Sequence, residues 1–179
     1  MERLREIQAE FAVEIRTRYE HRAKSCATCD TPGACCLDEH FVNVRISRLE
    51  ARLIEKTLQK LPEQKQKEIY ERVEKTVAKY GLSESGDTIV QTFACPLYEK
   101  GSGCLVHNEA KPLPCINHAC YERKDDLPPD ELLAEHEMQV DELNTRTYGK
   151  SMPLLPLPVA LLTNSSQLAS GNRYGNQQD

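Results

Sequence analysis

Eight cysteines constrain this chain of 179 residues more than any other feature. They form two groups of four, with the spacings C-x2-C-x5-C-C and C-x8-C-x10-C-x4-C. The predicted metal ligands are Cys26, Cys29, Cys35, Cys36, Cys95, Cys104, Cys115 and Cys120. Thiols gathered in fours on turn-forming segments are the usual ligands of zinc and of iron-sulfur clusters. The cysteine pattern therefore predicts one or two metal centres.

The expected compartment supports this interpretation. The first residues, MERLREIQAEF, are charged from the second position and lack the apolar run of a secretory signal. No stretch approaches the apolar length needed to cross a bilayer. We therefore expect a cytoplasmic protein, in which cysteines serve metal or redox chemistry more often than disulfides. Disulfides remain the alternative if the chain is secreted without a recognisable signal.

Composition limits the core and the partners. Hydrophobic residues make up 39% of the chain, aromatic residues 6%, and tryptophan is absent. This is a thin core for the length, so something besides apolar burial is expected to help fix the fold. The net charge of −5 gives no basic surface for nucleic acid or an anionic membrane. The expected partner is thus an unidentified protein or small molecule.

Apolar periodicity predicts helices before and between the cysteine groups. Residues 2–24 carry one apolar stripe at helical spacing, formed by Leu4, Ile7, Phe11, Ile15 and Tyr19. A β-branched run at 41–46 predicts a short strand. Ser47 and Glu50 then fit a capping box that starts a helix to about Leu61. Pro62 suits the first turn of a second helix, which Gly81 ends, so a helical hairpin should separate the two groups.

The rest of the chain predicts turns, one more helix and an extended strap. Residues 81–120 favour short strands and turns, with a hairpin turn at 99–103. Pro128 and Pro129 start the last expected helix. In SMPLLPLPVALL, residues 151–162, three prolines predict an extended segment that covers the core, or else an arm that binds a partner or a second copy.

These elements predict an α+β fold that is mainly helical, with amphipathic helices around an irregular cysteine-rich centre and short strands. Residues 1–162 are expected to form a single metal-binding domain. The tail at 163–179 is polar and is expected to be disordered.

The adjacent pair Cys35 and Cys36 bears on how many centres exist. Neighbouring side chains in extended backbone point in opposite directions, so the pair would not easily bind one tetrahedral ion. We expect the two thiols to serve different sites, which requires both cysteine groups to lie close together in space. The alternative is one extended cluster reached through a strained turn.

Sulfur ligands suit zinc, copper(I) or iron-sulfur clusters and exclude magnesium and calcium. The bacterial ferredoxin spacing is absent, so the choice between an iron-sulfur cluster and zinc stays open. Four nearby basic residues could offset the negative charge of a thiolate centre, although some should be ordinary surface: Lys100, Lys111, Arg123 and Lys124. His107 and His118 could ligate a metal or donate a proton. We favour the simpler interpretation that both histidines are polar residues in turns, because eight thiols already complete two four-coordinate sites.

Taken together, the motifs resemble the YkgJ-type cysteine-cluster proteins, a family with a zinc- or iron-chelating domain. The resemblance rests on the first cysteine group and on three later pieces: residues 95–98 (CPLY), 103–107 (GCLVH) and 111–115 (KPLPC). It implies a metal or iron-sulfur centre held by the eight cysteines. Some relatives are linked to flagellin lysine N-methylation, but this chain shows no glycine-rich loop for S-adenosylmethionine. Lys111 and His107 also stand where the family usually has Arg and Tyr.

The expected function is therefore metal binding by eight cysteines, with an iron-sulfur cluster or zinc supporting redox or macromolecule-modification chemistry. The alternative is an interaction module in which structural zinc fixes the loops without catalysis. Metal storage or delivery is a third possibility. The sequence does not decide whether the protein is an enzyme, and it assigns no catalytic residue, because no cysteine stands apart with a matched histidine.

Overall fold

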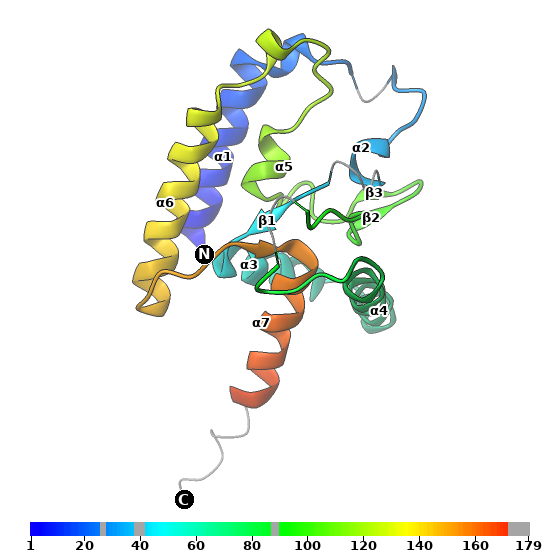
Figure 1. The fold of residues 1–179 in the computed structure, drawn as a ribbon, viewed down its shortest axis with the longest axis vertical. Helices are drawn as coiled ribbons and strands as arrows, with labels where there is room; N and C mark the ends of the chain where they lie inside the picture. Colours follow the sequence, from blue (N-terminus) through cyan, green and yellow to red (C-terminus); the bar gives the residue numbers. More distant parts are fainter. Residues whose placement is uncertain (26–27, 38–41, 87–89, 172–179) are drawn as a thin grey trace, which may run out of the picture.

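The computed structural model describes residues 1–25, 28–37, 42–86 and 90–171. Within these ranges the chain is mainly helical, with two small antiparallel sheets, as the expected α+β class requires (Figure 1). No helix in these ranges is both long and apolar enough to cross a membrane. The elements in chain order are α1 (Glu2–Arg18), 3-10 helix η1 (Glu20–Arg22), α2 (Ala34–Leu37), β1 (Arg45–Ile46), α3 (Arg48–Leu58), α4 (Glu63–Tyr80), β2 (Tyr98–Glu99), β3 (Gly103–Cys104), α5 (Leu113–Asn117), 3-10 helix η3 (Lys124–Asp126), α6 (Asp130–Tyr148), β4 (Leu155–Pro156) and α7 (Leu157–Gly171).

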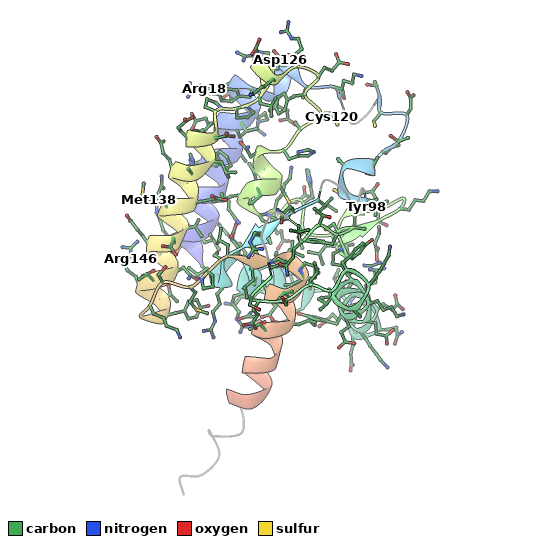
Figure 2. All side chains as sticks on the ribbon, in the orientation of Figure 1. Arg18, Tyr98, Cys120, Asp126, Met138 and Arg146 are labelled. Atoms are coloured by element: carbon green, nitrogen blue, oxygen red, sulfur yellow. The ribbon has the colours of Figure 1, made fainter. Side chains whose placement is uncertain are left out.

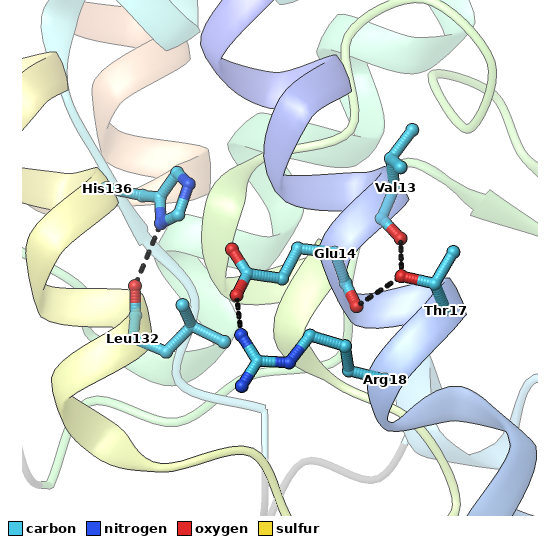
Figure 3. Close-up of polar contacts among 6 residues, drawn as sticks. All are labelled: Val13, Glu14, Thr17, Arg18, Leu132 and His136. Carbon is cyan, nitrogen blue, oxygen red and sulfur yellow. Dashed lines mark hydrogen bonds and ion pairs between the residues drawn. The ribbon is translucent and has the colours of Figure 1, made fainter.

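Helices α1 and α6 lie side by side at one edge of the molecule (Figure 1). All five residues of the predicted stripe are buried, which confirms the buried face, although α1 ends at Arg18 and not near residue 24. The Phe11 ring stacks on the His136 ring of α6, with centroids 4.3 Å apart. His136 donates from Nδ1 to the Leu132 carbonyl oxygen at 2.9 Å, which turns its ring toward α1 (Figure 3). The contact between α1 and α6 therefore includes an aromatic stacking pair, in which a hydrogen bond fixes the orientation of the His136 ring.

The predicted capping box at the start of α3 is present. Glu50 Oε2 accepts from the Ser47 amide at 2.9 Å and from its hydroxyl at 3.0 Å, while Ser47 Oγ accepts from the Glu50 amide. Glu50 Oε1 accepts from the Leu113 amide at 3.1 Å. Since both oxygens are used, this buried carboxylate caps α3 and also anchors the start of α5.

The expected helical hairpin is replaced by a different packing, in which α7 lies against both α3 and α4. The boundary at Gly81 is as predicted, since this residue ends α4 in the left-handed conformation with φ of +60°. The helix that packs on α3 and α4 comes from a segment expected to be extended.

Residues 151–162 are extended only as far as β4, which pairs with β1 in the register Arg45–Pro156 and Ile46–Leu155. Helix α7 then begins at Leu157, so the expectation of a wholly extended segment is wrong. Pro158 falls in the first turn of α7, where a proline costs no hydrogen bond. The segment does cover the core, because its residues 156–161 are all buried.

The tail also differs from the expectation. Helix α7 continues to Gly171, so residues 163–171 are helical where we expected disorder. Residues 172–179 lie outside the described part of the chain. Asn164 of α7 is buried and donates to Glu55 Oε2 of α3 at 2.6 Å. This hydrogen bond holds α7 against α3. It accounts for the helix continuing into the polar residues after Leu162.

Candidate thiol centre

The fold brings the two cysteine groups together through backbone hydrogen bonds. The Cys95 amide donates to the Cys36 carbonyl at 2.8 Å, and the Phe93 amide donates to the Val42 carbonyl at 3.0 Å. A second link joins the other ends of the groups, where the Lys24 amide donates to the Cys120 carbonyl at 2.9 Å. This agrees with the expectation that both groups lie close in space.

Four cysteines form what we call the thiol centre: Cys36, Cys95, Cys104 and Cys115. Burial first, and then the neighbouring Cys35, Cys95 and Cys104, raise the pKa of Cys36 to about 12. Burial also raises the pKa of Cys115 well above its ordinary value, with added contributions from Cys95, Cys104 and Cys36. These mutual effects place the four sulfur atoms within electrostatic range of one another.

The thiol centre does not follow the grouping seen in the sequence, because it takes one cysteine from the first group and three from the second. Cys104 is delivered by the hairpin of β2 and β3, whose register pairs Tyr98 with Cys104. The predicted turn at 99–103 is therefore confirmed. Cys115 comes from α5, a short helix that we did not expect within 81–120.

The remaining described cysteines lie around this centre. Cys35 is exposed and next to Cys36. Cys29 and Cys120 lie near Lys24, whose pKa is raised first by the hydrogen bond to Glu122 and then slightly by these two thiols. Figure 2 shows Cys120 on the irregular segment that follows α5. The predicted ligand Cys26 lies outside the described residues.

The expected extended backbone at Cys35 and Cys36 is wrong, because both residues lie in the single helical turn of α2. That turn begins after Gly33, which has φ of +82° and accepts from the Cys36 amide at 2.9 Å. A Cβ atom at Gly33 would sit 1.9 Å from the Tyr98 ring. Tyr98 also donates from its hydroxyl to the Pro32 carbonyl at 2.9 Å, close to α2 (Figure 2). The close contact between Gly33 and Tyr98 thus packs α2 against the β2–β3 hairpin.

Two cations face the thiol centre. Lys111 lowers the pKa of Cys104 and Cys115, although burial outweighs its effect in both cases. Arg72 of α4 acts in the same direction on Cys95, whose pKa burial raises to about 11. Of the four basic residues that the sequence suggested as counter-charges, only Lys111 acts on the cysteines of the thiol centre. Arg123 pairs with Asp126 at 2.8 Å, and Lys100 and Lys124 are exposed.

The sequence did not predict a role for Arg72, because it is one of many charged residues in the helical segment 63–80. Its Nη1 donates to Glu99 Oε1 at 2.8 Å. Its Nε and Nη2 are buried and have no hydrogen-bond partner among the described residues. Two unpartnered guanidinium donors near Cys95 are costly unless something beside them accepts, and a thiolate can.

The surroundings of the two histidines near the centre favour their neutral forms. Burial lowers the pKa of His107 and of His118, and the charge of Lys111 lowers both further. Among the described residues, no three His, Cys, Asp or Glu side chains are arranged so that they could hold a metal ion. The seven described cysteines form no disulfide with one another. The donor chemistry thus suits a soft metal, while the side-chain positions do not form a finished site.

Comparisons with protein-family models, with curated proteins and with solved structures gave no match to this chain. The resemblance to the YkgJ-type proteins therefore stays a prediction.

Proposed function

We propose that the protein binds a soft metal, as zinc or within an iron-sulfur cluster, through the thiol centre. The observation that carries the proposal is the convergence of Cys36, Cys95, Cys104 and Cys115 from segments that lie far apart in the sequence. Gathering four thiols in a partly buried site disfavours their ionisation, because each thiolate raises the cost of the next. A bound cation reverses that balance by stabilising every thiolate at once.

The unpartnered donors of Arg72 support the same conclusion. A centre of four thiolates around a divalent ion is a dianion, and a buried guanidinium would offset part of that charge. Cysteine has one side-chain torsion, so a sulfur atom can move between staggered positions while the backbone stays fixed. Metal binding would use that freedom to bring the four sulfurs into a tetrahedral arrangement.

The proposal extends to the outer cysteines as further ligands: Cys26, Cys29, Cys35 and Cys120. Cys29 and Cys120 lie near Lys24, which suits a second site with its own cation. We infer that the metal supports redox or modification chemistry in the cytoplasm, where free thiols persist. The second candidate is a structural-zinc interaction module, favoured by the central place of the thiols between α2, α5 and the β2–β3 hairpin.

The experiment is the metal and acid-labile sulfide content of protein purified anaerobically without added metal, with a visible spectrum. Iron with sulfide and a brown colour supports a cluster, and zinc without colour supports the structural candidate. Protein that contains neither metal, and takes up neither zinc nor ferrous iron when titrated, overturns the proposal. Cys36→Ser should lower metal content and soluble yield together. The exposed neighbour Cys35→Ser then tests whether the outer cysteines take part.

A further inference from the structure

A cavity of about 730 Å³ opens along α1, between this helix, α5 and the 107–111 loop. Its volume lies within the range of about 300–1,000 Å³ that is usual for small-molecule sites. Two small residues of α1, Ala9 and Ala12, line its middle. Their short side chains leave room for a ligand to lie along the helix. The four cysteines of the thiol centre do not line it.

The charge of the lining is opposite to that of the chain. Four basic side chains line the cavity against two acidic ones: Arg5, Arg16, Lys60, Lys111, Glu20 and Glu109. Lys60 forms an ion pair with Glu109, so these two cancel. Arg5, Arg16 and Lys111 form no ion pair with a residue that the structure describes. A positive cavity on a protein with net charge −5 indicates a site for an anion.

A buried amide gives a second and independent observation. Gln8 lines the cavity and is 7% exposed. Its Nε2 is buried and donates to no partner in the described part of the chain. A buried donor without a partner costs free energy that an oxygen atom of a ligand would recover. The amide can donate to any oxygen acceptor, and the guanidinium groups favour one that carries negative charge.

The positions of the two arginines limit the shape of the ligand. Arg5 and Arg16 are eleven positions apart on one face of α1, which is about 16 Å along the helix axis. Each guanidinium presents a planar pair of donors that fits a carboxylate or a phosphate. One compact anion could not use both ends of so long a cavity. On α1 itself, Ala9, Ala12 and Ile15 lie between them and give an apolar strip on which an uncharged linker could rest.

We propose that this cavity binds a small organic molecule with two separated anionic groups, carboxylates or phosphates, one near each arginine. The apolar linker lies over Ala9 and Ala12, and Gln8 donates from its amide to one anionic group. Lys111 lines this cavity, and its charge also acts on Cys115 of the thiol centre. The inference does not depend on whether the thiol centre holds a metal.

Isothermal titration calorimetry of the full chain at low ionic strength tests the proposal. The probes are suberate and fructose 1,6-bisphosphate, each with two separated anionic groups, and octanoate with one. Either doubly charged probe should bind saturably, and which one does distinguishes a dicarboxylate from a bisphosphate ligand. Octanoate should bind about tenfold more weakly, because it loses one charged contact.

Matched variants on α1 locate the site. Arg5→Gln and Arg16→Gln should each weaken binding of the doubly charged probe about tenfold, while the fold, measured by circular dichroism, stays the same. Arg3→Gln and Arg18→Gln are the controls, since they change the net charge equally. Arg3 pairs with Glu6, and neither Arg3 nor Arg18 lines the cavity. Arg18 pairs with Glu14 (Figure 3). The proposal is overturned if neither doubly charged probe binds, if octanoate binds equally well, or if the controls weaken binding as much.

Discussion

Glu50 Oε1 accepts a hydrogen bond from the Leu113 backbone amide at 3.1 Å, although 63 positions separate the two residues. The other oxygen of the same carboxylate accepts from the amide and hydroxyl of Ser47. Glu50 therefore fixes the first turn of α3 and the first turn of α5 at once. Since α5 carries Cys115, this buried carboxylate also positions one sulfur of the thiol centre.

Replacing Glu50 with glutamine should destabilise the protein. An amide has one acceptor oxygen where the carboxylate uses two, so either Ser47 or Leu113 loses its partner. Leaving one buried donor unsatisfied costs about 1–3 kcal/mol. Urea unfolding measures the loss. Glu63→Gln, at an exposed position in the first turn of α4, is the matched control and should change stability by no more than about 0.5 kcal/mol.

The same variant should change how stability depends on pH. Burial raises the pKa of Glu50 above its ordinary value of 4.5, although hydrogen bonds from Ser47 and Leu113 oppose the shift. The folded state therefore keeps the proton to higher pH than the unfolded state. The contribution of Glu50 to stability falls as the pH rises from about 4.5 through the raised pKa. The stability advantage of wild type over Glu50→Gln should shrink across that window, and an advantage that grew with pH would contradict the assignment.

Gly33→Ala should separate α2 from the β2–β3 hairpin. The added Cβ would overlap the Tyr98 ring, and the residue would have to keep a φ of +82°. Cys36 would then lose its place in the thiol centre and become more accessible. We expect faster reaction of its thiol with a disulfide reagent. Tyr98→Phe is the control, because it keeps the ring and removes only the bond to Pro32. Equal thiol reactivity in wild type and Gly33→Ala would refute this role for the contact.

Arg72→Met should weaken metal binding by the thiol centre about tenfold, because it removes the guanidinium that stabilises charge near Cys95. Lys65→Met is the matched control. Lys65 pairs with the same Glu99 oxygen at 2.6 Å, so both variants remove one positive charge and one ion pair with that carboxylate. Competition with a chromophoric chelator measures the affinity. If both variants bind metal equally well, the partner of the Arg72 donors lies elsewhere.

Local patterns predicted the elements whose stability is local. The α1 stripe, the Ser47 cap, the end of α4 at Gly81 and the turn at 99–103 each depend on residues within a few positions of one another. Helix α7 was missed because three prolines suggested extended backbone. Two of them, Pro153 and Pro156, precede the helix, and Pro158 sits in its first turn.

The makeup of the thiol centre could not be predicted from spacing, because it depends on contacts between distant segments. The Cys95 amide donates a hydrogen bond to the Cys36 carbonyl, although 59 positions separate the two residues (95 − 36). Arg72 reaches the centre only because α4 packs beneath the hairpin, where it also pairs with Glu99 of β2. The sequence carries no local signal for either relationship. The cysteines themselves were visible because their chemistry is unusual wherever they lie.

Asn164→Ala should loosen α7 from the core. Asn164 donates to Glu55 Oε2 at 2.6 Å, and Glu55 is buried in α3 beside Arg52, which pairs with it at 2.9 Å. Without the amide, the carboxylate keeps one charged partner and loses a buried donor, at a cost of about 1–3 kcal/mol. Thr163→Ala is the neighbouring control, because its bond to Glu84 is exposed and should contribute little. Urea unfolding compares the two variants. Equal losses would mean that α7 is held by its apolar residues alone, and that the buried Glu55–Asn164 bond adds nothing to the stability of the helix in its place.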